Sequence, residues 1–98
     1  MDERTAERLV NGIVYDIDRV EDLDAPENVT DCVDAMFEGR YFIQSPAEFL
    51  EAIDIVVPKG HLSESTLSFS HDYNEQQLLA FLTRVGVELR NRLAQQPA

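Results

Sequence analysis

Carboxylates are the side chains of this sequence that offer the most chemistry. Nine of them fall between Asp16 and Glu38, and Arg19 is the one base in that segment. Closely spaced carboxylates can ligate a cation, transfer protons or hold a basic partner. The segment lacks the central glycine and the donor spacing of a calcium loop, and no further motif supports acid–base catalysis. These carboxylates therefore favour the electrostatic binding of a partner.

The cysteine and the histidines do not complete a catalytic constellation. Cys32 lies between Val29 and Val33 on an apolar helix face, which indicates a buried, inert thiol rather than a nucleophile. His61 and His71 stand ten residues apart in a loop, where a histidine is usually a capping or exposed residue. Motifs for nucleotide binding, hydrolysis or metal binding are missing. We therefore expect no enzyme activity, no cofactor and no metal site.

Four of the carboxylates form a stripe along one predicted helix. They are Glu27, Asp31, Asp34 and Glu38, and successive members are four, three and four residues apart. Like charges at such spacing cost about 0.2–0.5 kcal/mol per pair, and aspartate is a weak helix former. Because the stripe lowers helix stability, we expect it to serve binding; a solvated face is the alternative. Reversing Asp31 and Asp34 to lysine should then leave the fold intact.

A second group of site residues is predicted on the preceding helix. Tyr15, Asp18 and Asp22 stand at steps of three and four residues, on the face opposite the apolar positions. An exposed aromatic beside carboxylates indicates a binding surface, whereas a Tyr15 folded over the edge of the bundle is the alternative. The predicted partner-binding residues are thus Tyr15, Asp18, Asp22, Glu27, Asp31, Asp34 and Glu38.

Apolar residues at helical spacing predict four main helices that position these side chains. The helices span residues 5–22, 25–38, 46–57 and 72–94. Capping boxes are predicted at three helix starts, and the pairs are Asp24 with Glu27, Ser45 with Glu48, and Asp72 with Glu75. Short connections favour an all-α fold, a compact antiparallel bundle in a single domain 1–98 with a frayed tail at 95–98.

Two connections carry apolar residues outside these helices. Residues 41–43, Tyr-Phe-Ile, form a short link that we expect to tuck against the core. Residues 60–71 are rich in serine and hold no helical period. Leu62, Leu67 and Phe69 should pin this second segment to the core.

Charge is the most unusual feature of the composition. The 98 residues carry a net charge of −11, and 19 acids face 8 bases. Residues 1–60 hold 15 of these acids and 5 of the bases, so nearly all of the negative charge lies there. Such a field repels nucleic acids and anionic membranes and favours a basic partner. No signal peptide or membrane span is predicted, and the single cysteine suits a reducing compartment, so we expect a cytoplasmic protein.

Part of the chain resembles a known family. Residues 39–53 read Gly-Arg-Tyr-Phe-Ile-Gln-Ser-Pro-Ala-Glu-Phe-Leu-Glu-Ala-Ile, and Phe-Ser-His-Asp at 69–72, Glu75 and the run 78–82 follow after a loop. This pattern, within residues 39–93, is similar to small immunity proteins of bacterial toxin systems. These proteins inhibit contact-dependent growth inhibition toxins and colicin D-type tRNases. The resemblance implies a cytoplasmic protein that binds the nuclease domain of one toxin and blocks its active site.

The charge and the resemblance together predict an immunity protein. Its acidic helical face would cover the basic cleft of a nuclease toxin, a tRNase or another RNase, and the protein would be a monomer or weak dimer. One alternative is a nucleic-acid mimic that inhibits a restriction or CRISPR-type machine with the same face. The other is a helical adaptor that dimerises through the apolar outliers Ile55 and Val87, in which case its binding would be insensitive to salt.

Overall fold

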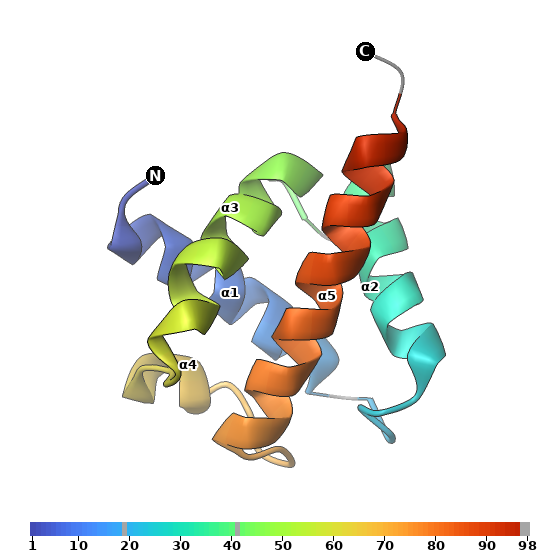
Figure 1. Ribbon diagram of the computed structural model, residues 1–98. Helices are drawn as coiled ribbons and strands as arrows, with labels where there is room; N and C mark the ends of the chain where they lie inside the picture. Colours follow the sequence, from blue (N-terminus) through green and yellow to red (C-terminus); the bar gives the residue numbers. More distant parts are fainter. Residues whose placement is uncertain (19, 41, 97–98) are drawn as a thin grey trace.

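The protein is built from α-helices, and its computed structural model describes residues 1–18, 20–40 and 42–96. Five α-helices and one 3-10 turn follow in chain order (Figure 1): α1 Glu3–Ile17, α2 Pro26–Glu38, α3 Pro46–Val56, the turn η1 Val57–Lys59, α4 Glu64–Leu67 and α5 Glu75–Gln95. The described residues include no strand. The predicted all-α fold with four main helices packed against one another is therefore confirmed.

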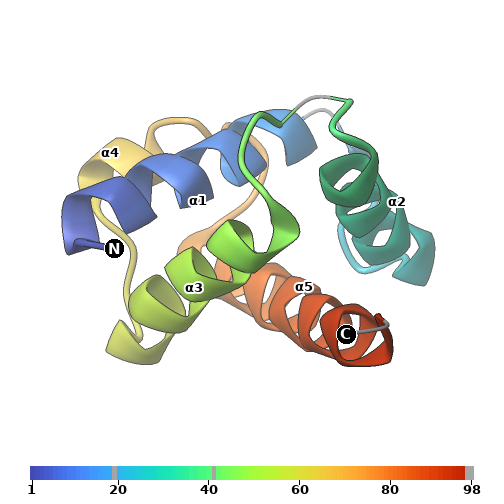
Figure 2. The ribbon, with the colours of Figure 1, turned by 90° about the horizontal axis from the view of Figure 1, so that it is seen from above.

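The helix α3 lies between α1 and α5 and packs against both, whereas α2 packs mainly against α5 (Figure 2). The short helix α4 rests on α1, at the opposite end of the molecule from α2. Four helices contribute large, fully buried side chains to one core, among them Ile13, Met36, Phe49 and Phe81. The apolar positions that predicted the helices thus form the core that holds the acidic face of α2 in place.

Caps define the helix ends, and two of the three predicted capping boxes need correction. Ser45 and Glu48 form the predicted box at the start of α3. At α5 the box joins Asn74 to Gln77 instead of Asp72 to Glu75, so the helix starts at Glu75. At α2 no side chain caps the helix, because Ala25 occupies the N-cap and Pro26 follows it. Pro26 needs no cap for its own nitrogen, since proline has no N–H.

The first helix is shorter than predicted. It ends at Ile17, and the N–H of Val20 donates to the carbonyl of Ile17 in a turn that replaces a further helical bond. The hydroxyl of Tyr73 donates to the carbonyl of Val20, and Asp18 binds His71. Distant residues thus bind the Val20 carbonyl and the Asp18 carboxylate, and the helical period that continues to residue 22 in the sequence does not extend α1. Arg19 lies outside the described residues.

The apolar link at 42–43 divides between core and surface. Phe42 is buried against the ring of Phe49, with 4.9 Å between the ring centroids. Ile43, by contrast, is 97% exposed, so the prediction that the whole link tucks against the core is wrong for this residue. Tyr41 lies outside the described residues.

The serine-rich segment contains α4, which the sequence did not predict as a helix. Ser63 caps it by accepting the N–H of Thr66, and the Thr66 hydroxyl donates to Asn11 of α1. Leu62 is buried and Leu67 is half-buried, as predicted for residues that pin this segment, whereas Phe69 is exposed and the prediction is wrong for this residue. Gln95, the first residue of the predicted frayed tail, still belongs to α5, and residues 97–98 lie outside the described residues.

Candidate protein-binding surface

Two carboxylates on the outer face of α2 point to solvent without a partner. Glu27 and Asp31 are exposed, and neither forms an ion pair or hydrogen bond with a residue of the described ranges. Their position follows from the apolar residues of α2, because Val29, Val33 and Met36 are buried and turn the acidic stripe outward. No described residue pairs with either carboxylate, so both remain available to a cation from outside.

The other two carboxylates of the stripe are engaged within the molecule. Arg92 of α5 reaches across to α2, where its Nη1 donates to Asp34 while its Nε donates to Glu88 at 2.8 Å. The hydrogen bonds from Arg92, first to Asp34 and then to Glu88, raise the pKa of this guanidinium. Glu38 pairs with Arg40, just beyond the end of α2. The stripe therefore has a free part at Glu27 and Asp31 and a part that supports the fold.

Asp18 holds the end of α1 to the segment that precedes α5. Its Oδ1 accepts the backbone N–H of His71 at 2.8 Å, and its Oδ2 lies 2.7 Å from Nδ1 of the same histidine. The hydrogen bond from the His71 side chain lowers the pKa of Asp18, and the same bond raises the pKa of His71. Asp18 is thus a structural anchor in the described molecule, whereas the imidazole of His71 remains largely exposed.

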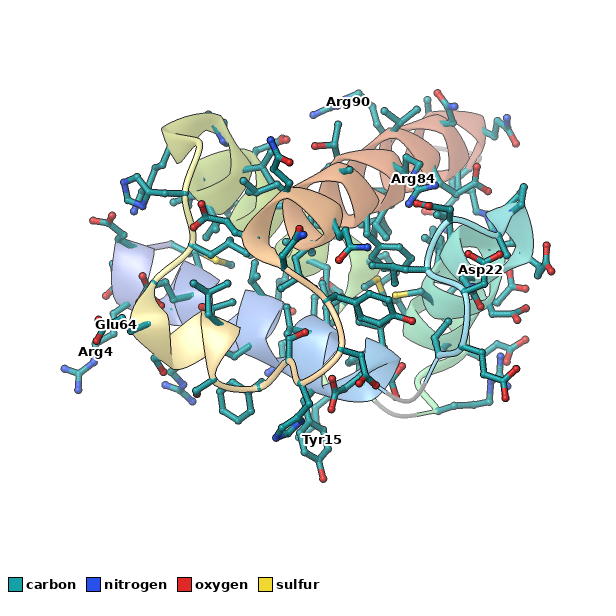
Figure 3. The ribbon with its side chains drawn as sticks, turned by 90° about the horizontal axis from the view of Figure 1, so that it is seen from below. Arg4, Tyr15, Asp22, Glu64, Arg84 and Arg90 are labelled. Atoms are coloured by element: carbon teal, nitrogen blue, oxygen red, sulfur yellow. The ribbon has the colours of Figure 1, made fainter. Side chains whose placement is uncertain are left out.

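Asp22 lies in the connection between α1 and α2 rather than on α1. Its carboxylate accepts the N–H of Asp24 at 3.1 Å, and its carbonyl accepts the side chain of Asn28. Arg84 of α5 closes the same connection by donating to the carbonyls of Leu23 and Asp24 (Figure 3). The predicted helical face of Tyr15, Asp18 and Asp22 does not form, because α1 ends before Asp18.

Tyr15 projects from α1 into solvent (Figure 3) and is 68% exposed. The edge of its ring meets Phe69, with centroids 6.2 Å apart and the rings nearly perpendicular. Tyr15 and Asp16 line one surface cavity, and Asp16 also lines a neighbouring cavity together with Asp31 of α2. The structure therefore connects two predicted site residues, Tyr15 and Asp31, through Asp16, which was not among the predicted site residues.

Cys32 and the histidines occupy the positions that the sequence predicted. Cys32 is buried, and burial raises the pKa of its thiol to about 12. Both His61 and His71 are exposed. Over the described ranges, no group of three or more histidine, cysteine or acidic side chains could hold a metal ion. In the same ranges, no helix is both long and apolar enough to cross a bilayer.

Comparison with family models, curated proteins and solved structures gave no match to this chain. The similarity of residues 39–93 to toxin immunity proteins therefore stays a prediction from the sequence. The two apolar residues that the adaptor alternative uses for dimerisation differ in their exposure to solvent. Ile55 is half-buried against the core, whereas Val87 is 52% exposed and lines a groove between α5 and α2.

Proposed function

We propose that this protein is an inhibitor that binds a basic protein through the acidic surface formed by Glu27 and Asp31 of α2 with Asp16 and Tyr15 of α1. The observation that carries the proposal is the pair of exposed, unpartnered carboxylates at Glu27 and Asp31. A stripe of like charge weakens its own helix, and two of its members receive no compensation inside the described fold. A cationic partner would supply that compensation.

The class of partner that suits this surface best is a nuclease toxin. An enzyme that handles RNA presents a basic cleft to the phosphate backbone, and a rigid acidic helix is complementary to such a cleft. The strong net charge of −11 steers a basic partner toward the surface and accelerates association. The similarity to immunity proteins supports the same function. We further propose that the protein acts in the cytoplasm, where such a toxin would act, and performs no catalysis of its own.

The proposal is tested by capturing the partner from the cells that make the protein. The tagged chain is incubated with lysate at low salt, washed and then eluted at high salt, and the eluate is assayed for cleavage of tRNA. We expect a basic protein in the eluate, with a nuclease activity that is absent from the intact complex and appears on dissociation. An eluate without latent nuclease activity would contradict the toxin proposal, and a DNA-cleaving machine in its place would favour the nucleic-acid mimic.

Charge-reversed variants show which surface is responsible. Glu27→Lys/Asp31→Lys removes the two free carboxylates of α2. The matched control, Glu64→Lys/Glu7→Lys, makes the same change in net charge on α4 and in the first half of α1, at two carboxylates that form no ion pair within the described ranges. Figure 3 shows Glu64 at the opposite end of the molecule from Asp22 and α2. We expect the first variant to lose the captured nuclease and the control to retain it. Equal capture by both variants would show that the charge acts only as a diffuse field.

A further inference from the structure

The exposed apolar side chains of the described residues are unevenly placed. Five large ones are exposed, namely Met1, Tyr15, Ile43, Phe69 and Val87. Three of these, Tyr15, Ile43 and Phe69, come from distant parts of the chain and are linked through Tyr15, whose ring contacts Phe69 and which lines a cavity together with Ile43. Single exposed apolar residues are normal, whereas a cluster of them marks an interaction site. We call these three residues the apolar patch.

Tyr15 stands at the centre of the apolar patch. One edge of its ring contacts Phe69, and Tyr15 and Ile43 line the same surface cavity of ≈ 450 Å³. The buried ring of Phe42 forms part of the lining, and Arg8 and Gln44 supply polar groups to it. A cavity of this size lies within the range of about 300–1,000 Å³ that is typical of binding pockets. An aromatic and an arginine beside an apolar hollow are the residue types that dominate the binding energy of protein interfaces.

The apolar patch is continuous with the acidic surface. Asp16 lines the cavity of Tyr15 and also the cavity that contains Asp31, so one carboxylate borders both. Exposed charge pairs contribute little affinity by themselves, whereas a desolvated apolar centre surrounded by polar groups contributes most of it. The acidic surface therefore needs such a centre nearby if it is to hold a partner tightly, and the apolar patch is placed to provide it.

We propose that the apolar patch is the desolvated centre of the interface and that it receives an apolar side chain from a basic partner segment. This inference rests on the proposed function, since the partner is the same. Charge argues against a second copy of the chain as the occupant. Each copy carries a net charge of −11, and a symmetric contact over Tyr15 would bring Asp16 and Asp31 of both copies to one interface.

Two synthetic helical peptides of equal length and charge serve as probes. One combines lysine with leucine and the other lysine with glutamine, so that they differ in apolar side chains and share a good helix propensity. Their affinities are measured by fluorescence anisotropy at low salt. For the wild-type protein we expect about tenfold tighter binding of the lysine–leucine peptide, the ratio that one apolar anchor provides.

Two variants locate that preference. Tyr15→Ala/Ile43→Ser removes two members of the apolar patch, and both residues are exposed, so the fold should tolerate the change. Val87→Ser is the matched control, because Val87 is also exposed but lies in the groove between α5 and α2. We expect the first variant to bind both peptides equally and the control to keep the preference for leucine. A preference that survives in the first variant, or that is lost in the control, would overturn the inference.

Failure of the inference and failure of the proposed function give different results. If the acidic surface binds basic segments without an apolar centre, both peptides bind the wild type equally, and Glu27→Lys/Asp31→Lys weakens both. If the proposed acidic surface is not the binding surface, this charge-reversed variant binds both peptides as the wild type does. Self-association of the wild type in sedimentation, lost in Tyr15→Ala/Ile43→Ser, would assign the apolar patch to a second copy and overturn the inference.

Discussion

Carboxylate side chains have different roles in two acidic regions of this molecule. At the end of α1, Asp18 accepts two hydrogen bonds from His71 and joins segments that lie 53 residues apart in the sequence. On the outer face of α2, Glu27 and Asp31 make no contact with a described partner. The first region contributes to folding, and the second carries repulsion that the fold leaves uncompensated. The partner of a carboxylate, rather than its identity or helical position, decides which role it has.

Within the α2 stripe the same contrast recurs over a single helical turn. Asp34 is held by Arg92, whereas Asp31, three residues earlier, is free. The predicted tolerance of Asp34 to charge reversal therefore needs correction, because a lysine there would face the guanidinium of Arg92. Substitutions in each region test this division between structural and binding carboxylates. They are ordered below by the size of the stability change that we expect.

Loss of a core side chain should cause the largest change in the free energy of unfolding. Leu82 is fully buried in α5, so Leu82→Ala should lower the free energy of unfolding by about 2–5 kcal/mol. Urea unfolding followed by circular dichroism measures this change. A loss below about 0.5 kcal/mol would mean that this face of α5 does not belong to the core.

The Arg92 contact should rank second. Arg92→Ala removes the bonds to both Asp34 and Glu88 and adds their negative charges to the surface of α2 and α5. Because the side chain is only 25% exposed, we expect a loss of about 1 kcal/mol, at the upper end of the range for surface ion pairs. Urea unfolding measures this loss, and Arg90→Ala is the control because the Arg90 side chain is more exposed than that of Arg92. An equal loss of stability in Arg92→Ala and Arg90→Ala would show that the Arg92 contact stabilises the fold no more than an exposed ion pair does.

Asp18→Asn tests the junction at the end of α1 through the pH dependence of Tm. Asparagine keeps an oxygen for the N–H of His71 and removes the charge. The lowered pKa of Asp18 gives stability that is present above its ordinary value of 3.8 and is lost as pH falls through the lowered value. The raised pKa of His71 gives stability that is present below 6.5 and is lost as pH rises through the raised value.

The Tm of Asp18→Asn should therefore fall furthest below the wild-type Tm between pH 3.8 and 6.5, and the difference should shrink on both sides. Thermal melts across this range measure it. The variant His71→Gln is the complementary control, since it removes the same ion pair from the other side. A constant difference at every pH would show that the charge of Asp18 does not contribute to the junction.

The smallest stability effect should come from the outer face of α2. Glu27→Lys/Asp31→Lys relieves repulsion along the stripe and sacrifices the favourable position of Glu27 in the first helical turn. These effects oppose each other, so Tm should stay at the wild-type value. Asp34→Lys on the same stripe should lower Tm, because it repels Arg92. A fall of Tm in the double variant comparable to that of Asp34→Lys would mean that the whole stripe supports the fold.

The sequence alone predicts the elements that depend on residues close together in the chain. Apolar spacing located the four main helices, and Ser45 with Glu48 located the start of α3. The burial of Cys32 also followed from its neighbours on the helix. Such features depend on residues within one or two turns, which a single sequence displays.

The features that the sequence did not reveal depend on contacts between distant segments. The early end of α1 is fixed by Tyr73 and His71, and the engagement of Asp34 depends on Arg92, 58 residues away. For the same reason the convergence of Tyr15, Ile43 and Phe69 leaves no trace in helical spacing. The sequence therefore identified most of the acidic residues of the candidate surface but could not separate the structural ones from the free ones.

The central claim is that the free carboxylates of α2 and the adjoining face of α1 bind a basic partner. The most direct test is the map of backbone amide signals in an NMR spectrum of the ¹⁵N-labelled protein, recorded while the captured nuclease is added. We expect the perturbed amides to cluster on Glu27, Asp31 and Tyr15 and their neighbours, whereas α4 and the outer face of α3 stay unchanged. Perturbations confined to α3 and α4 would contradict it.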